Sequence, residues 1–89
     1  MVKLCIFKGG EKVWYLIRKN GKSILHRVNG PAIVDHEDKD YFQNGKRHRL
    51  DGPAIELWDG RKFWYYQDQE INCSTQEEFE RLIKLKILW

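Results

Sequence analysis

Cysteines and long apolar runs are scarce in this 89-residue chain. Its two cysteines, Cys5 and Cys73, lie near opposite ends and form no C-x-x-C pair, and no segment has the features of a signal peptide. We therefore expect a reduced, cytoplasmic environment. No apolar run approaches the roughly 18–20 residues that a membrane-spanning helix needs, so we expect no membrane partner.

The residue spacings of common catalytic, metal and phosphate sites are also missing. The glycines are spread one per turn and form no glycine-rich phosphate loop. Neither the cysteines nor His36 form a close ligand pair of the kind that binds zinc. The carboxylates of Asp35, Glu37, Asp38 and Asp40 cluster, but without the glycine and the spacing of a calcium loop. We therefore predict no enzyme activity, no cofactor and no metal site.

An internal repeat dominates the chain. The segment 26–33 (His-Arg-Val-Asn-Gly-Pro-Ala-Ile) returns 22 residues later as His-Arg-Leu-Asp-Gly-Pro-Ala-Ile at 48–55. Such a period is typical of arrays built from one structural unit. Proline has no N–H with which to close a tight turn, so each Gly-Pro step predicts an open corner before the next strand. The residues with predicted structural roles in these corners are His26, Gly30, Pro31, His48, Gly52 and Pro53.

The two repeated histidines have two possible roles, as metal ligands or as structural hydrogen-bonding groups. Because His26 and His48 occupy the same repeat position, each followed by arginine, we favour a ring hydrogen-bonded to a neighbouring corner.

Tight turns are predicted between the open corners. Asn20-Gly21-Lys22, Asn44-Gly45-Lys46 and Asp59-Gly60-Arg61 keep an N–H after glycine, so each can close a two-residue hairpin, with Asn20-Gly21 as a type I′ turn. Tight turns and open corners thus alternate, as in a regular antiparallel meander. After Tyr66 the pattern decays through residues 67–70, as expected of a terminal unit.

Aromatic pairs recur at Trp14-Tyr15, Tyr41-Phe42 and Trp64-Tyr65. Neighbouring residues on a strand face opposite sides of the sheet, so each pair places one ring on each face. One row of rings then either stays exposed as an interaction surface or is covered by the stems of flanking lysines and arginines.

The periodicity changes to that of a helix near the end of the chain. Ser74 or Thr75 can cap its N-terminus, with Glu77 or Glu78 completing a capping box. Apolar residues then follow at helical spacing. The predicted apolar stripe consists of Phe79, Leu82, Ile83 and Ile87, widened by Leu85 and Trp89.

Together these patterns predict one domain, residues 1–89, of mainly β (α+β) structure. Residues 1–73 are expected to form a curved antiparallel meander of roughly six to eight short strands, built from hairpin repeats of about 23 residues. Residues 74–89 are expected to form one C-terminal α-helix packed on a face of the sheet.

Basic residues are concentrated near the N-terminus, where residues 1–35 contain seven basic and two acidic side chains. Basic residues also recur at repeat positions: Arg27, Arg49 and Arg61, with Lys22, Lys46 and Lys62. As a ladder with interleaved aromatics, they would hold single-stranded nucleic acid. Alternatively they pair with carboxylates on neighbouring strands, and we favour this pairing. The candidate carboxylates are Asp35, Asp40, Asp51, Glu56 and Asp59.

The His-Arg-x-Asx-Gly-Pro-Ala-Ile units, with their aromatic pairs and Asn-Gly-Lys turns, resemble the MORN-like repeat proteins of tailed phages and large viruses. The resemblance covers roughly residues 10–73, and residues 73–89 resemble the C-terminal helix of such proteins. The chain departs from MORN repeats proper in having His-Arg where His-Gly is usual, and in its Gly-Pro-Ala corner. The resemblance implies a small virus-encoded protein that binds and inhibits a host factor or a bacterial defence complex.

We therefore predict a non-enzymatic protein-protein interaction module in the cytoplasm of a bacterial host, with a host protein or protein complex as its partner. The alternatives are nucleic-acid binding through a basic, aromatic sheet face, and self-assembly, including a homodimer, through the edge strand at residues 2–8. The candidate partner-binding residues are Trp14, Tyr15, Tyr41, Phe42, Trp64, Tyr65, Arg27, Arg49 and Arg61.

Overall fold

The computed structural model describes residues 2–87, which form ten short strands and one helix. The mainly antiparallel β fold with a single C-terminal helix is as predicted. Trp89 and the side chain of Ile87, which the predicted helical stripe included, lie outside the described residues. The elements are β1 (Val2–Ile6), β2 (Lys12–Ile17), β3 (Ser23–Leu25), β4 (Ile33–Asp35), β5 (Asp38–Asp40), β6 (Phe42–Gln43), β7 (Lys46–Arg47), β8 (Ile55–Glu56), β9 (Lys62–Tyr66), β10 (Gln69–Ile71) and α1 (Gln76–Ile87).

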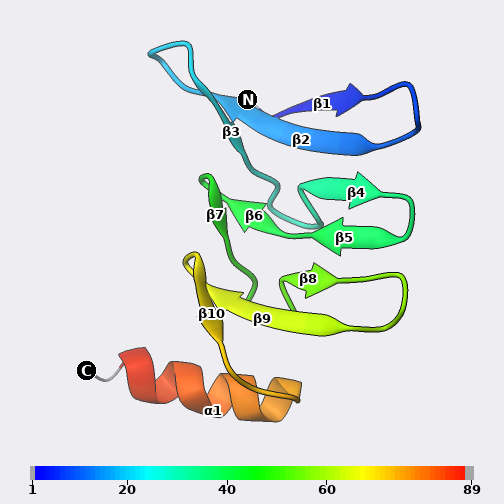
Figure 1. The fold of residues 1–89 in the computed structure, drawn as a ribbon. Helices are drawn as coiled ribbons and strands as arrows, with labels where there is room; N and C mark the ends of the chain where they lie inside the picture. The colour runs from blue at the N-terminus through cyan, green and yellow to red at the C-terminus, as the bar shows by residue number, and fades with distance from the viewer. Residues whose placement is uncertain (1, 88–89) are drawn as a thin grey trace.

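The strands are stacked one after another in a thin layer, with β1 at one end and α1 at the other (Figure 1). The principal extents are 38 × 34 × 17 Å and the radius of gyration is 14.0 Å, whereas a compact chain of this length has about 12 Å. A layer this thin has little room for a central core. Most residues therefore lie close to one of the two faces.

The main sheet contains eight strands, and it departs from a plain meander at one point in each repeat. The two halves of β2 pair with different strands on the side away from β1. Tyr15 lies opposite Leu25 of β3, and Val13 lies opposite Ile33 of β4. The open corner between β3 and β4 therefore sits at the middle of β2, beside Trp14.

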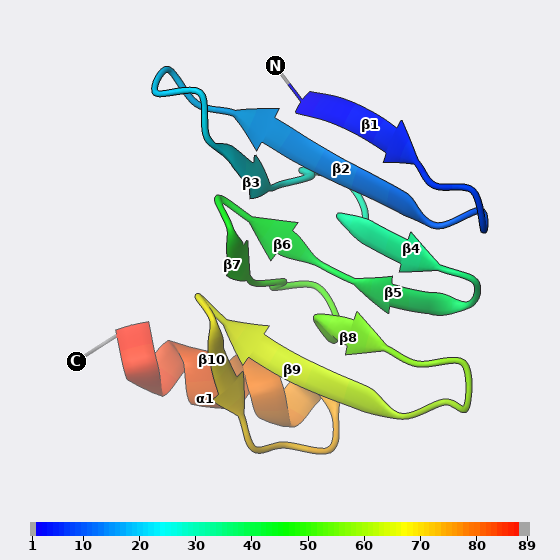
Figure 2. The same cartoon turned by 45° about the horizontal axis from the view of Figure 1, so that its top comes forward.

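The same split recurs around Tyr41, where the long strand is interrupted between β5 and β6 (Figure 2). There, β8 pairs with β5 and β7 pairs with β6. The Trp14 N–H donates to the Ala32 carbonyl at 2.7 Å, and the Tyr41 N–H donates to the Ala54 carbonyl at 2.8 Å. Both alanines are fully buried, which explains why the corner motif needs a small apolar residue after its proline.

Two of the three turns predicted as two-residue hairpins have a different geometry. Gly21 and Gly60, like Gly10, have φ of 84–94°, and each N–H donates to the carbonyl three residues earlier. Asn20 lies outside the left-handed region, so these loops are type I turns followed by a left-handed glycine. The Asn20 Oδ1 accepts the Lys22 N–H at 3.0 Å and holds this conformation. The prediction of a type I′ turn at Asn20-Gly21 was therefore wrong.

Two turns on the opposite side from the β1–β2 turn have the type I′ pattern of two left-handed residues, which was predicted for neither of them, although Asn44-Gly45 was predicted to close a two-residue hairpin. Asn44 and Gly45, between β6 and β7, have φ of 53° and 79°. Gln67 and Asp68, between β9 and β10, have φ of 45° and 71° without any glycine. The repeat pattern therefore does not decay after Tyr66 as predicted, because a third hairpin follows. Contacts from the preceding unit hold it, including a 2.8 Å bond from the Asp68 N–H to the Arg47 carbonyl.

The helix packs on the last repeat. Thr75 caps its N-terminus, since its Oγ1 accepts the Glu78 N–H at 3.2 Å, and the Glu78 carboxylate accepts the Ser74 N–H at 3.0 Å. Phe79 and Ile83 are buried against Trp64. The apolar stripe is narrower than predicted, because Leu82 and Leu85 are exposed.

Candidate binding face

A stacked arginine braces the first open corner. The guanidinium of Arg27 lies 3.8 Å from the centre of the Trp14 ring, and its Nη1 donates to the Pro31 carbonyl at 3.2 Å. A Cβ at Gly30 would come within 2.8 Å of the Arg27 Cζ, so a larger residue there would displace the guanidinium from this position. The second corner repeats the arrangement. The Arg49 guanidinium lies 3.9 Å from the centre of the Tyr41 ring, and its Nη1 donates to the Pro53 carbonyl at 3.1 Å. A Cβ at Gly52 would come within 2.7 Å of the Arg49 Cζ. We call these two arrangements the first and second joints.

Each repeated histidine links its unit to the next hairpin. The Asn44 N–H donates to His26 Nδ1 at 2.9 Å, and the Gln67 N–H donates to His48 Nδ1 at 3.0 Å. This confirms the predicted structural hydrogen bond, with the correction that the partner is the tight turn of the next unit rather than a Gly-Pro corner. The acceptor role requires Nδ1 to be unprotonated.

We expect His48 to make stability depend on pH. Burial lowers the pKa of His48 from its ordinary value near 6.5. As pH falls below that value the unfolded chain binds a proton before the folded chain does, so the free energy of unfolding decreases until the folded-state pKa is passed. Urea denaturation at a series of pH values should show this decrease, and His48→Asn should reduce it. Equal pH profiles for the two proteins would contradict the assignment.

The aromatic pairs do not form an exposed row. Phe42 and Trp64 are buried, and Trp14, Tyr15, Tyr41 and Tyr65 are half-buried. By strand alternation Trp14, Tyr41 and Trp64 share one face, and Tyr15, Phe42 and Tyr65 share the other. The prediction that Phe42 and Trp64 bind a partner directly was therefore wrong. Arginine side chains lie over four of the rings, Trp14, Tyr41, Phe42 and Tyr65, which is the alternative that the sequence left open. Residues of α1 cover Trp64.

Arg47 was not among the predicted site residues, yet it organises the opposite face. Its guanidinium lies 4.9 Å from the Phe42 ring centre and 5.0 Å from that of Tyr65. It also donates two hydrogen bonds to the Asp40 carboxylate, at 2.7 and 2.9 Å. No repeat marks this residue, because the first unit has Leu25 in the corresponding place before histidine.

The repeated arginines differ in their charged partners. Arg49 pairs with Asp51 at 3.0 Å and with Glu56 at 2.8 Å, and Arg61 pairs with Asp59 at 2.7 Å in the β8–β9 turn. The Arg61 N–H also donates to Asp59, which lowers the pKa of that carboxyl. Pairing with carboxylates is thus confirmed for Arg49 and Arg61. Arg27 differs, because none of the carboxylates in residues 2–87 lies within 4.0 Å of it.

Exposed apolar side chains gather on the face that carries the joints. Val28 and Leu50, at the tips of the two corners, are 65% and 54% exposed. A groove of about 340 Å³ lies between these tips, and Arg27, Tyr41 and Arg49 contribute to its walls. Val2, Leu4 and Ile6 of β1 are exposed on the same face, because Leu4 lies opposite Trp14. We call this surface, formed by Val2, Leu4, Ile6, Arg27, Val28 and Leu50, the corner face.

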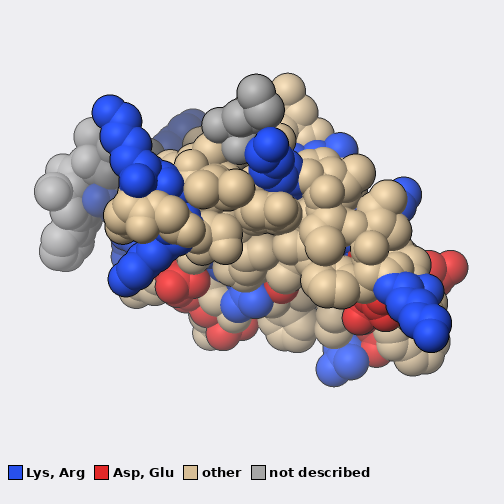
Figure 3. All heavy atoms as spheres, turned by 90° about the horizontal axis from the view of Figure 1, so that it is seen from above, with Lys and Arg blue, Asp and Glu red and all other residues tan. Residues whose placement is uncertain are grey.

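The β1 end of the stack continues this apolar character. Seen from above, the surface is mostly uncharged, with lysine and arginine around it and the acidic side chains along one side (Figure 3). β1 pairs only with β2 and forms a free edge of the sheet.

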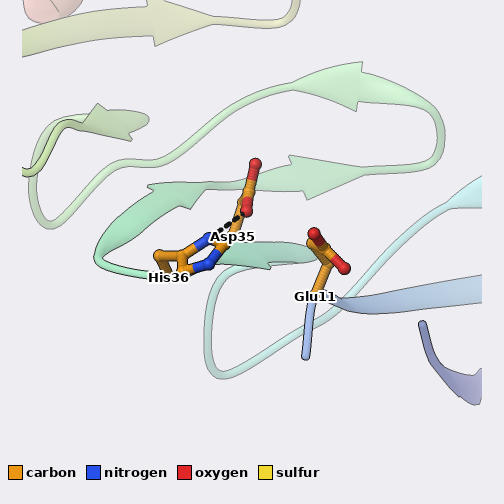
Figure 4. A group of neighbouring side chains, drawn as sticks. All are labelled: Glu11, Asp35 and His36. Atoms are coloured by element: carbon orange, nitrogen blue, oxygen red, sulfur yellow. Dashed lines mark hydrogen bonds and ion pairs between the residues drawn. The ribbon is translucent and has the colours of Figure 1, made fainter. Parts of the chain in front are cut away.

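The turns on the β1–β2 side bring together a small titratable cluster (Figure 4). Ligand-type atoms of Glu11, Asp35 and His36 lie within 4.8 Å of one another. This group is at the surface, and Asp35 accepts a 2.7 Å hydrogen bond from His36 Nδ1, which raises the pKa of the imidazole. Its geometry is that of a solvated, hydrogen-bonded turn.

Trp58 lies beside this cluster in the β8–β9 turn and is 70% exposed. The backbone N–H of Trp58 donates to the Asp38 carboxylate at 2.8 Å, and this bond connects the turn to β5. No repeat in the sequence marks Trp58, since this residue stands outside the aromatic pairs.

Comparison with known proteins finds no matching family model, no matching curated protein and no matching solved structure. Within residues 2–87, the structure contains no helix long and apolar enough to cross a membrane.

Proposed function

We propose that the chain is a non-enzymatic protein-protein interaction module that binds its partner through the corner face. One observation carries this proposal: five of the ten exposed large hydrophobic residues in the described chain belong to that face. Three of them, Val2, Leu4 and Ile6, follow one another along one face of β1, and the other two, Val28 and Leu50, lie at the tips of the two corners. Concentration of exposed apolar surface on one side is typical of a protein interface.

The joints make this surface suitable for binding. Each corner is fixed by an arginine that stacks on an aromatic ring and donates to a proline carbonyl. Val28 and Leu50 are therefore presented from braced loops, and little conformational entropy is lost when a partner covers them. The pairing of Arg49 and Arg61 with carboxylates favours a protein partner over a nucleic acid, because these charges are already satisfied.

The resemblance to MORN-like repeat proteins supplies the proposed setting. We propose a phage- or virus-encoded protein that binds a host factor or a bacterial defence complex in the host cytoplasm.

Substitution of the two corner tips tests the binding face. Immobilised wild-type protein should retain a host protein from bacterial lysate, and Val28→Asp combined with Leu50→Asp should abolish that retention because it places charge in an apolar interface. Ile17→Asp is the matched control, since Ile17 is also exposed but points to the opposite face.

Circular dichroism confirms that the variants are folded, and sedimentation separates a foreign partner from a second 10.8 kDa copy bound through β1. If the wild type retains nothing, or if Ile17→Asp and the corner variant behave alike, the proposal fails.

A further inference from the structure

The two joints provide an internal comparison. Both arginines stack on an aromatic ring and donate to the carbonyl of the corner proline. Within residues 2–87, carboxylates contact the arginine of the second joint alone, with Asp51 on Arg49 Nε and Glu56 on Arg49 Nη1. The positions 22 residues earlier hold Asn29 and Val34. The first joint therefore has the guanidinium of the second without the acids that the second binds.

The surroundings of the first joint are basic on the corner face. Val34 lies opposite Lys12 of β2 and Lys39 of β5, just as Glu56 lies between Lys39 and Lys62. In the second joint a glutamate separates the two lysines, whereas in the first a valine does. The nearby carboxylates of Glu11 and Asp35 belong to alternate strand positions and face the other way. Arg27 and Lys12 thus place positive charge around a site in which no carboxylate of residues 2–87 pairs with Arg27. Glu56, opposite Lys39, and Asp51, which also lines the groove, both pair with Arg49.

We propose that the first joint is a binding site for a carboxylate side chain, Asp or Glu, supplied by a partner protein. The inference rests on the proposed function and specifies the chemistry of the partner. Stacking on Trp14 and the bond to Pro31 hold the Arg27 guanidinium in place, so a carboxylate meets a pre-oriented pair of N–H donors. Val28 and the adjacent groove receive an apolar side chain next to the acid. The recognised segment is therefore acidic with neighbouring apolar residues.

An acidic peptide provides the probe. We would titrate the ¹⁵N-labelled protein with a blocked hexapeptide of alternating Leu and Glu, and with the matched Leu and Gln peptide. The Arg27 Nε–H resonance should shift with the Glu peptide, and affinity for the Gln peptide should be about tenfold weaker. Equal shifts from the two peptides would overturn the proposal. So would saturation by a single-stranded oligonucleotide or by inorganic phosphate without saturation by the Glu peptide.

Filling the site from within the chain gives the sharper test. Asn29→Asp combined with Val34→Glu reproduces the acids of the second joint, so it should keep the fold and reduce Glu-peptide affinity about tenfold or more. The reverse pair, Asp51→Asn with Glu56→Val, should make the Arg49 Nε–H respond to the peptide.

Unchanged peptide binding by the filled variant would overturn the inference. Lysate capture that requires Val28 and Leu50 but persists in the filled variant would also overturn it, while leaving the proposed function in place.

Discussion

Replacing Phe79 by alanine is expected to lower the free energy of unfolding by about 3–5 kcal/mol, as for other fully buried aromatic residues. Phe79 is 1% exposed and is the largest fully buried side chain in the described structure. It contacts Trp64 and Ile83 in the cluster that attaches α1 to the last repeat. A domain of this size has only about 5–10 kcal/mol of stability in total, so the variant should be largely detached or unfolded at moderate urea concentrations.

Leu85→Ala is the matched control for this prediction, because it removes an apolar side chain from the same helix at a position that is 54% exposed. Its effect should stay within about 0.5 kcal/mol. Urea denaturation followed by tryptophan fluorescence and by far-ultraviolet circular dichroism measures both variants. Similar losses for Phe79→Ala and Leu85→Ala would show that the helix does not anchor the sheet through this cluster.

The second large effect is expected at the second joint. Arg49→Ala should cost about 2 kcal/mol, since it removes the stack on Tyr41 and leaves the half-buried Glu56 carboxylate without its partner. Arg27→Ala should cost only about 1 kcal/mol, because Arg27 stacks on Trp14 and donates to a carbonyl but neutralises no acid. Denaturation midpoints of the two variants give the comparison directly.

Arg49→Lys adds a check on the cause of that difference. Lysine keeps the charge but loses the planar stack and the paired donors, so it should restore only part of the lost stability. Equal losses for Arg27→Ala and Arg49→Ala would mean that the carboxylates contribute nothing to the joint.

The fold was predictable where local chemistry decides it. Proline at 31 and 53 forces an open corner, Asn44-Gly45 forms its two-residue turn, and Thr75 with Glu78 starts the helix. Each of these outcomes depends on a few adjacent residues. The Gln67-Asp68 turn was missed because no glycine marks it. Its left-handed backbone is imposed by His48 and Arg47, which are distant in sequence.

The candidate site was harder to predict for the same reason. Alternation correctly predicted that each aromatic pair places one ring on each face, but no periodicity indicates that an arginine folds back over Trp14 or Tyr41. The repeat also drew attention to residues that are identical in both copies. The site is instead distinguished by positions at which the copies differ, Asn29 against Asp51 and Val34 against Glu56. Those differences become meaningful only when the second joint shows what the acids contact.

The hydrogen bonds that each His-Arg pair makes have a consequence for how such a chain can evolve. The arginine of a joint donates to the proline carbonyl of its own corner, while the histidine beside it accepts a hydrogen bond from the following hairpin. A segment such as 26–47 therefore contains both partners of this contact, the His26 ring and the Asn44 N–H. Tandem duplication of that segment would lengthen the molecule by one unit that brings its own histidine contact, without altering the helix at the far end.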